Sequence, residues 1–442
     1  MARYGIFNWG GNTQTPETNL DVFKHDSICG NNGNLLFKNA VAKTLYIEKN
    51  MIEYLHFYNQ SCPNVANAYS HNNIDAINER FDALILSEAD LFNRSYKERF
   101  PYFTAALRKI KIPVIMIGVG MASSLGKEIL VSSSIDSDVK KFVAALLDHS
   151  ASIGVRGHCT GQYLRRLGFS SEQIDVIGCP TMFTNGKHLV LKGKIGTENE
   201  FRQSFVTFNG TLNKPNAARL LSSHDNHAFL PQDSFELFSA LFEDISDKSI
   251  FHNMLYHPAL RPEKVRFFTN VPQWRKCVGS AAFSFGSRVH GNLIALISGT
   301  PAYVLVTDAR TEELVQYHEI PYTYAIPDDA SLYDIYAGAD YTNTLRGHAA
   351  RFARYRAFLD KNNLYHCYMD EDSRNDAFEQ VFDEDAFPGH VAPVQCVSER
   401  EIKARMIYFM KDLENSRQPG VLASLSRERK AAILKKMESL LQ

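Results

Sequence analysis

The chain has 442 residues, and its 48 basic and 49 acidic side chains give a formal net charge of −1. This balance removes the overall electrostatic drive for binding nucleic acid. No apolar run is long enough to predict a membrane-spanning helix, and the first residues predict no signal peptide. Seven scattered cysteines without a CxxC pair favour reduced thiols over a disulfide framework or a zinc ribbon. We therefore expect a cytoplasmic enzyme of two or three domains, since a domain has about 150 residues.

The first part of the chain alternates between strand and helix patterns. Apolar residues at i, i+3, i+4, i+7 and i+8 predict a helix over 139–147. A second helix is expected to begin near Thr160 and to end at Gly168. Alternation of this kind is typical of a parallel, doubly wound sheet. The expected strands are 3–8, 81–86, 113–118, 153–156 and 174–177.

A second set of strand and helix patterns follows a polar, Gly-containing linker near 190–200. The fold class is therefore predicted as α/β, with two Rossmann-like domains facing a cleft in a GT-B-like arrangement, over residues 1–190 and 200–340. The expected strands are 204–208, 265–269, 281–285 and 302–306, with helices over 234–244 and 292–298.

Residues 345–442 are predicted as a helical extension. Its acid-rich stretch, 370–385, is expected to be a solvated linker. The basic amphipathic helix at 426–442 is expected to dock on the body or on another subunit. Peripheral attachment to an anionic membrane is the other interpretation.

The segment after the strand predicted at 281–285 carries the strongest candidate chemistry. Arg288 and His290 follow Ser287 at the carboxyl end of that strand and precede a helix, where ligands bind in open α/β sheets. The free amides of Gly291 and Asn292 favour an anion there. Arg288 supplies a permanent cation, and His290 can exchange protons near neutral pH. The alternative is a structural arginine and a capping histidine.

Two further segments are weaker candidates. Arg156 follows a short strand and is expected to place a second cation at the same cleft, although a solvated arginine fits as well. Asn32 and Asn34 precede or open a helix, where they could contact a ligand or serve as ordinary helix-start residues. His224 and His227 have metal-like spacing, but their polar surroundings predict a surface loop without metal.

Together these segments resemble the polysaccharide pyruvyl transferase family. The strongest match is Ser287-Arg288-Val289-His290-Gly291 with the later Gly299-Thr300-Pro301, and Asp308-Ala309-Arg310 resembles a further element of the family. Upstream, Val155-Arg156 and Asn32-Gly33-Asn34 resemble two weaker motifs. The chain departs from the family in two places. Ser87-Glu88-Ala89-Asp90 stands where members carry a Gly-rich turn, and Cys179 stands for an acidic residue.

The resemblance implies transfer of a pyruvyl group from phosphoenolpyruvate to a sugar or a lipid-linked oligosaccharide, without a cofactor or a metal. It implies His290 as acid and base, Arg156, Arg288 and the Gly291 amide as donor ligands, and Asp308 and Arg310 for the acceptor or for positioning. The N-terminal domain would take the acceptor and the C-terminal domain the donor. A homo-oligomer is left open. A GT-B glycosyltransferase using a nucleotide sugar, or an inactive sugar-binding partner, are the competing interpretations.

Overall fold

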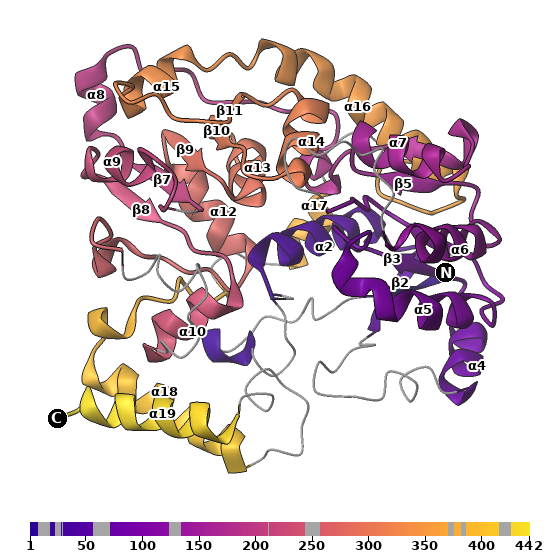
Figure 1. Ribbon diagram of the computed structural model, residues 1–442, viewed down its shortest axis with the longest axis horizontal. Coiled ribbons are helices and arrows are strands. Elements are labelled where there is room, and N and C mark those ends of the chain that lie inside the picture. Colours follow the sequence, from indigo (N-terminus) through magenta and orange to yellow (C-terminus); the bar gives the residue numbers. More distant parts are fainter. Residues whose placement is uncertain are drawn as a thin grey trace.

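The computed structural model describes residues 1–7, 18–22, 28, 30–55, 71–122, 134–210, 212–243, 257–369, 375–381, 386–414 and 426–442. Two parallel β-sheets, each covered by helices, form two lobes (Figure 1). This architecture confirms the predicted α/β class with two Rossmann-like domains in a GT-B-like arrangement.

The N-terminal sheet has the strand order β2-β1-β3-β4, and all of its pairs are parallel. A bridge between Val119 and Val155 continues it into the β5-β6 pair. The predicted strands are found here, but β2 was missed because its edge position leaves most of its residues only partly buried and blurs the apolar signal. The strands are β1 (Ala2–Phe7), β2 (Asn50–Leu55), β3 (Ala83–Leu86), β4 (Val114–Met116), β5 (Ile153–Val155) and β6 (Ile174–Val176). The helices are α2 (Asn32–Leu45), α4 (His71–Arg80), α5 (Phe100–Leu107), α6 (Asp136–Leu147) and α7 (His158–Arg166).

The C-terminal sheet has the order β11-β10-β9-β7-β8, again with parallel pairs. Beyond β8, the strand predicted at 265–269 is reduced to two single bridges, Phe229–Val265 and Phe267–Val391. The strands are β7 (Val206–Asn209), β8 (His227–Phe229), β9 (Phe283–Gly286), β10 (Ala302–Leu305) and β11 (Tyr322–Thr323). The helices are α8 (Glu198–Gln203), α9 (Ala217–Ser222), α10 (Ser234–Phe242), α12 (Val271–Ser280), α13 (Val289–Ile297), α14 (Ala309–His318) and α15 (Leu332–Gly338).

The prediction that His224 and His227 lie on the surface was wrong. Both are buried, with 3% and 7% of their surface exposed. His227 opens β8, and its ring packs edge-on against Phe208 of β7. Because β8 pairs with β7, these histidines belong to the core of the C-terminal domain.

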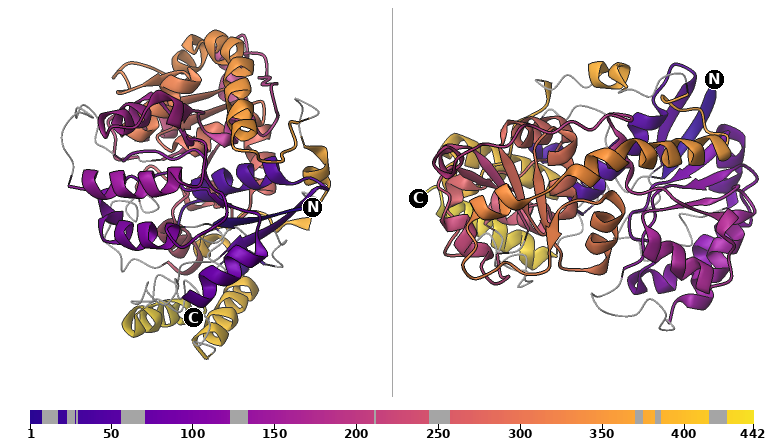
Figure 2. Two further views of the ribbon diagram at one scale, coloured as in Figure 1. Left: turned by 90° about the vertical axis from the view of Figure 1, so that its right-hand side faces the viewer. Right: turned by 90° about the horizontal axis from the view of Figure 1, so that it is seen from above.

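The residues after 340 form the predicted helical extension, and its helices pack against the two domains. α16 (Thr342–Lys361) runs from the C-terminal domain back to the N-terminal domain (Figure 2). At its end Lys361 forms an ion pair with Asp175 at 3.0 Å, and Asn362 accepts a hydrogen bond from the Ala151 amide. α18 (Glu399–Glu414) and α19 (Arg427–Ser439) pack together near α10, where Met437 is fully buried. The final helix is therefore docked on the body.

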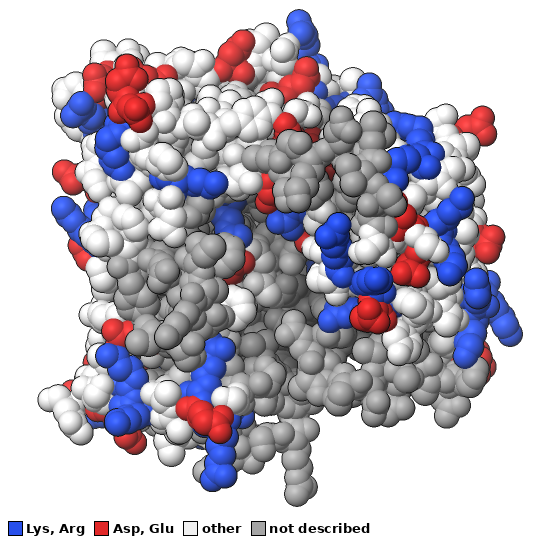
Figure 3. Space-filling view, in the orientation of Figure 1, with Lys and Arg blue, Asp and Glu red and all other residues white. Residues whose placement is uncertain are grey.

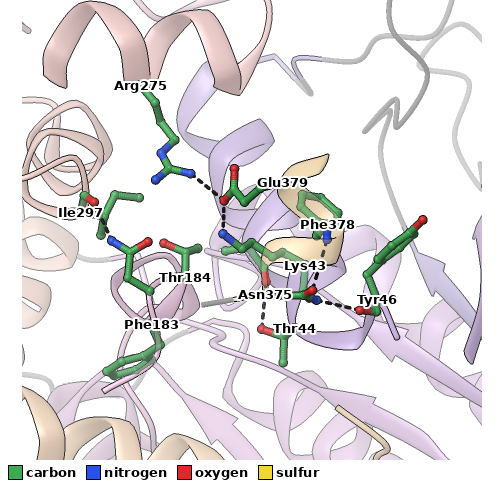
Figure 4. Close-up of polar contacts among 12 residues, drawn as sticks. Lys43, Thr44, Tyr46, Phe183, Thr184, Arg275, Ile297, Asn375, Phe378 and Glu379 are labelled. Carbon is green, nitrogen blue, oxygen red and sulfur yellow. Dashed lines mark hydrogen bonds and ion pairs between the residues drawn. The ribbon is translucent and has the colours of Figure 1, made fainter. Parts of the chain in front are cut away.

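The acid-rich stretch also differs from the expected solvated linker where it is described. α17 (Asp376–Val381) is held by Glu379, which forms ion pairs with the buried Lys43 of α2 and with Arg275 of α12 (Figure 4). The Asn375 amide donates to the carbonyls of Lys43 and Tyr46 at the end of α2. Residues 375–381, which we call the α17 strap, therefore connect α2 of the N-terminal domain with α12 of the C-terminal domain. Residues 370–374 and 382–385 lie outside the described residues.

Candidate active site between the two domains

A cavity of about 620 Å³ lies between the domains, at the carboxyl ends of their strands. That volume is in the range of pockets for small organic ligands, roughly 300–1,000 Å³. In Figure 3 this face of the molecule is hollowed between the two lobes. Both domains contribute to the wall. The cavity is lined by Asn31, Asn34, Ala89, Asp90, Arg156, Asn213, Lys214, Gln232, Asp233, Ser287, Arg288, Val289, His290, Thr307, Asp308, Arg310 and Thr311.

The N-terminal ends of four helices meet at this cavity. Their N-cap residues, Asn31 of α2, Asp233 of α10, Arg288 of α13 and Asp308 of α14, all line it. The backbones of Asn31 and Asp233 form an antiparallel bridge across the domain boundary, and the Asn31 amide donates to Asp233 at 2.6 Å. Asn31, Asp233 and Asp308 cap N–H groups of their own helices, whereas α13 has no side-chain cap. The free N–H groups and partial positive charge at the start of α13 therefore favour an anionic ligand.

The tight turn between β9 and α13 places the Ser287–Gly291 motif at the cavity. Gly286 adopts φ 149°, and a Cβ there would lie 1.5 Å from the Asn209 carbonyl oxygen of β7. Only glycine therefore allows β9 to approach β7 so closely. α13 begins at Val289, earlier than the predicted 292. His290 consequently lies in the first helical turn, facing the cavity.

The three arginines of the cavity differ in their partners. Arg288 forms an ion pair with Asp233. Arg310 forms ion pairs with Asp90 of the N-terminal domain at 2.8 Å and with Asp308 at 3.2 Å. Arg156 is 4% exposed, and its Nε is buried without a hydrogen-bond partner among the described residues. Glu313 and Asp90 act on its charge without forming an ion pair with it. Burying an unpaired cation is costly, so Arg156 is the cation most in need of an anionic ligand.

His290 lies where the two domains touch. Its Nε2 is 3.9 Å from the Cys179 sulfur, and its Nδ1 would be 2.6 Å from a Cβ added at Gly33 of α2. Burial, with Arg156 and Arg310 nearby, lowers the pKa of His290 to about 3. The ring is therefore neutral at pH 7 and is a proton acceptor in the empty site.

The family model for polysaccharide pyruvyl transferase matches residues 34–309, which is more than half of the chain. The chain belongs to the polysaccharide pyruvyl transferase family. The match spans Asn34, Arg156 and the Ser287–Gly291 motif and ends one residue before Arg310. No curated protein matches the chain.

Several solved structures of nucleotide-sugar proteins resemble this pyruvyl transferase family member at low similarity. The Anabaena HepE structure in complex with UDP and glucose has a TM-score of 0.42 at 9% identity, covering 86% of this chain and 98% of that one. A putative UDP-N-acetylglucosamine 2-epimerase from Listeria monocytogenes has a TM-score of 0.40 at 10% identity, with coverages of 86% and 94%. The Neisseria meningitidis UDP-GlcNAc 2-epimerase bound to UDP-GlcNAc has a TM-score of 0.39 at 11% identity, with coverages of 87% and 99%. These values are too low to carry a functional argument.

Most of the residues singled out in the sequence meet at the cavity of this pyruvyl transferase family member, and three do not. The Asn32 amide donates to the Phe268 carbonyl, and the Asn292 amide donates to the Gly286 carbonyl at 2.9 Å. Gly291 is buried beside Gln232 and Asn209. In the structure these three hold the framework around the cavity instead of lining it. The predicted residues that line it are Asn34, Arg156, Ser287, Arg288, His290, Asp308 and Arg310.

Sequence reasoning missed several polar residues of the cavity, among them Asp90, Lys214, Gln232 and Asp233. Asp90 could have been found from the sequence, because it follows the strand predicted at 81–86 and ligands bind at the carboxyl ends of parallel strands. Gln232 and Asp233 follow β8, which was not predicted, so nothing placed them at that edge. Lys214 belongs to the segment after β7, whose path the sequence does not reveal.

The described residues contain no group of three or more His, Cys, Asp or Glu side chains arranged to hold a metal ion. Among the same residues, no helix combines the length and apolar character needed to cross a membrane.

Proposed function

We propose that this protein transfers the pyruvyl group of phosphoenolpyruvate to two hydroxyls of a sugar, forming a cyclic ketal and releasing phosphate. The acceptor would be a sugar or a lipid-linked oligosaccharide in the assembly of a bacterial surface polysaccharide, handled in the cytoplasm. The observation that carries the proposal is the buried, unpartnered Arg156 in the same cavity as His290. Membership of the family supports it.

The charges of the cavity suit a small donor with two anionic groups. Phosphoenolpyruvate carries a carboxylate and a phosphate, and fork-shaped guanidinium groups bind both kinds of anion. Arg156 can bind either the carboxylate or the phosphate without first breaking an ion pair. Arg288 and Arg310 can bind the other, with their paired carboxylates limiting the excess positive charge of the empty site. No cofactor is required for this binding.

The reaction needs one proton on the methylene carbon of the donor and the removal of protons from the attacking hydroxyls. A neutral His290 can pass the proton of the first hydroxyl to the methylene carbon, which makes the central carbon cationic, and the hydroxyl oxygen then bonds to that carbon. Attack by the second hydroxyl breaks the carbon–oxygen bond to phosphate, which leaves with the remaining proton. The arginines stabilise the departing phosphate.

The test is to incubate the protein with phosphoenolpyruvate and a panel of p-nitrophenyl glycosides, and to measure released phosphate and product mass. We expect a mass gain of pyruvate minus water. His290→Gln should lower turnover by at least 100-fold, the usual range for losing an acid–base group, while binding of phosphoenolpyruvate by calorimetry stays intact. The matched control is His149→Gln, outside the cavity. A hexose-sized gain from nucleotide sugars, or full activity of His290→Gln, would contradict the proposal.

A further inference from the structure

Gln232 is an unusual member of the cavity wall, because its backbone is fully held while its side chain is not. Its N–H donates to the Glu236 carboxylate at 2.8 Å, and its carbonyl accepts from the Asn32 N–H at 3.0 Å. The residue is only 2% exposed and lines the cavity. Its Nε2 is buried without a hydrogen-bond partner among the described residues. A buried donor without a hydrogen bond is unfavourable, and a ligand that accepts a hydrogen bond from it removes that cost.

Gly291 makes the room that Gln232 occupies. A Cβ at Gly291 would lie 2.4 Å from Gln232 Nε2 and 2.9 Å from Asn209 Oδ1. The Gln232 backbone is held by its two hydrogen bonds, and the Asn209 amide donates to Ser284 and Asn292. A side chain at position 291 would therefore have to displace the Gln232 amide. The glycine of the Ser287–Gly291 motif therefore determines where the Gln232 amide lies. The absence of a side chain at Gly291 has a steric function, and the anion contact expected for its backbone amide stays a prediction.

A side-chain amide and a guanidinium group favour different ligand groups. An amide is neutral and both donates and accepts hydrogen bonds, as a sugar hydroxyl does. The anionic groups of the donor gain more from charged partners, which the cavity offers in Arg156, Arg288 and Arg310. A three-carbon donor leaves much of the 620 Å³ unfilled. The amide therefore suits a ligand that fills the remaining space with hydroxyls.

We propose that Gln232 binds a hydroxyl of the acceptor sugar and helps to determine which sugar is accepted. The inference rests on the proposed pyruvyl transfer. It also places part of the acceptor against the C-terminal domain, to which Gln232 belongs, although the sequence favoured the N-terminal domain as the acceptor side.

The test compares Gln232→Leu and Gly291→Ala with Gln316→Leu, which changes an exposed glutamine of α14 outside the cavity. Loss of one neutral hydrogen bond should raise the acceptor KM roughly three- to tenfold. Calorimetric affinity for phosphoenolpyruvate should stay unchanged. Gly291→Ala should reproduce the effect because the added methyl group displaces the amide. A purely structural role would instead lower the melting temperature without separating the two substrates.

The outcomes also separate this inference from the proposed function. Binding of the p-nitrophenyl glycosides is measured by saturation-transfer NMR, which needs no turnover. Glycoside binding that weakens in Gln232→Leu, without phosphate release from the wild type, would support Gln232 and overturn the pyruvyl transfer. Equal losses of donor and acceptor affinity, unchanged affinities for both, or a wild type that binds no glycoside would overturn the role of Gln232.

Discussion

Arg156 illustrates how a single residue can be costly for the fold and necessary for function. Its guanidinium lies against Gly120, where a Cβ would come within 2.4 Å of its Nε, so glycine provides the space for it. Burial lowers the pKa of the Arg156 guanidinium, and the nearby Glu313 and Asp90 oppose this shift only in part, so holding this charge is unfavourable for the fold. We infer that the cost is recovered when an anion binds.

This view predicts opposite effects of Arg156→Met on stability and on binding. Affinity for phosphoenolpyruvate should fall roughly 10- to 100-fold, as expected for loss of a charge-assisted contact. The melting temperature should stay the same or rise, because an unpaired buried charge is removed. Calorimetry and thermal unfolding measure the two effects, with Arg165→Met on the exposed side of α7 as control. Weakened folding with normal donor affinity would show that Arg156 is structural.

At the scale of elements, α14 joins the two domains along one face. Arg310 contacts Asp90, Glu313 accepts from the Thr160 N–H and hydroxyl, and the Tyr317 hydroxyl donates to the Val176 carbonyl. Positions 310, 313 and 317 lie on the same side of a helix. This side of α14 therefore contacts the N-terminal domain through all three side chains, and one of them, Arg310, also lines the cavity.

The α17 strap gives a prediction about interdomain stability. Glu379→Gln would leave the Lys43 ammonium, 2% exposed, without its carboxylate partner. Breaking a buried ion pair in this way should cost about 3 kcal/mol in the free energy of unfolding, measured by urea denaturation. The double variant Lys43→Met with Glu379→Leu should recover much of that loss, because the buried Lys43 ammonium is removed as well and Arg275, the second partner of Glu379, is partly exposed. Glu399→Gln, which removes an exposed pair with Lys403, is the control. A Glu379→Gln protein as stable as the wild type would rule the strap out as a clamp.

At the scale of the whole molecule, buried histidines should make the fold sensitive to acid. His348 lies against Phe183 at the junction of α16 with both domains, and burial lowers its pKa from 6.5 to about 4. His348 therefore binds a proton near pH 6.5 in the unfolded chain, but only near pH 4 in the folded protein. The stability from the neutral ring is complete above pH 6.5 and is lost as the pH falls towards 4.

The variant His348→Gln should isolate this effect. The wild type should lose about 1.4 kcal/mol of unfolding free energy per pH unit between pH 6.5 and 4 relative to the variant. Urea unfolding at pH 7.5, 6 and 5 measures the difference. A difference between the two proteins that does not change with pH would show that His348 is not held neutral.

Local patterns in the sequence were sufficient for the alternating elements and for the motif that carries Arg288 and His290. Buried parallel strands are apolar runs, and glycines and polar residues at their carboxyl ends stand out against them. Short or partly exposed strands such as β2 and β8 lack this contrast, and the residues after β8, Gln232 and Asp233, were missed with it.

The sequence alone determined the α/β class and the two domains, and most of the residues that it singled out do lie at the cavity, because backbone preferences and apolar periodicity act over short distances. Only the tertiary structure decided which arginine is unpartnered, that Gly291 makes room for Gln232, and that residues after 340 bind both domains together. Partners such as Asp233, Asp90 and Glu379 come from segments far apart in the chain. Their pairing depends on how the helices pack, which no local pattern encodes.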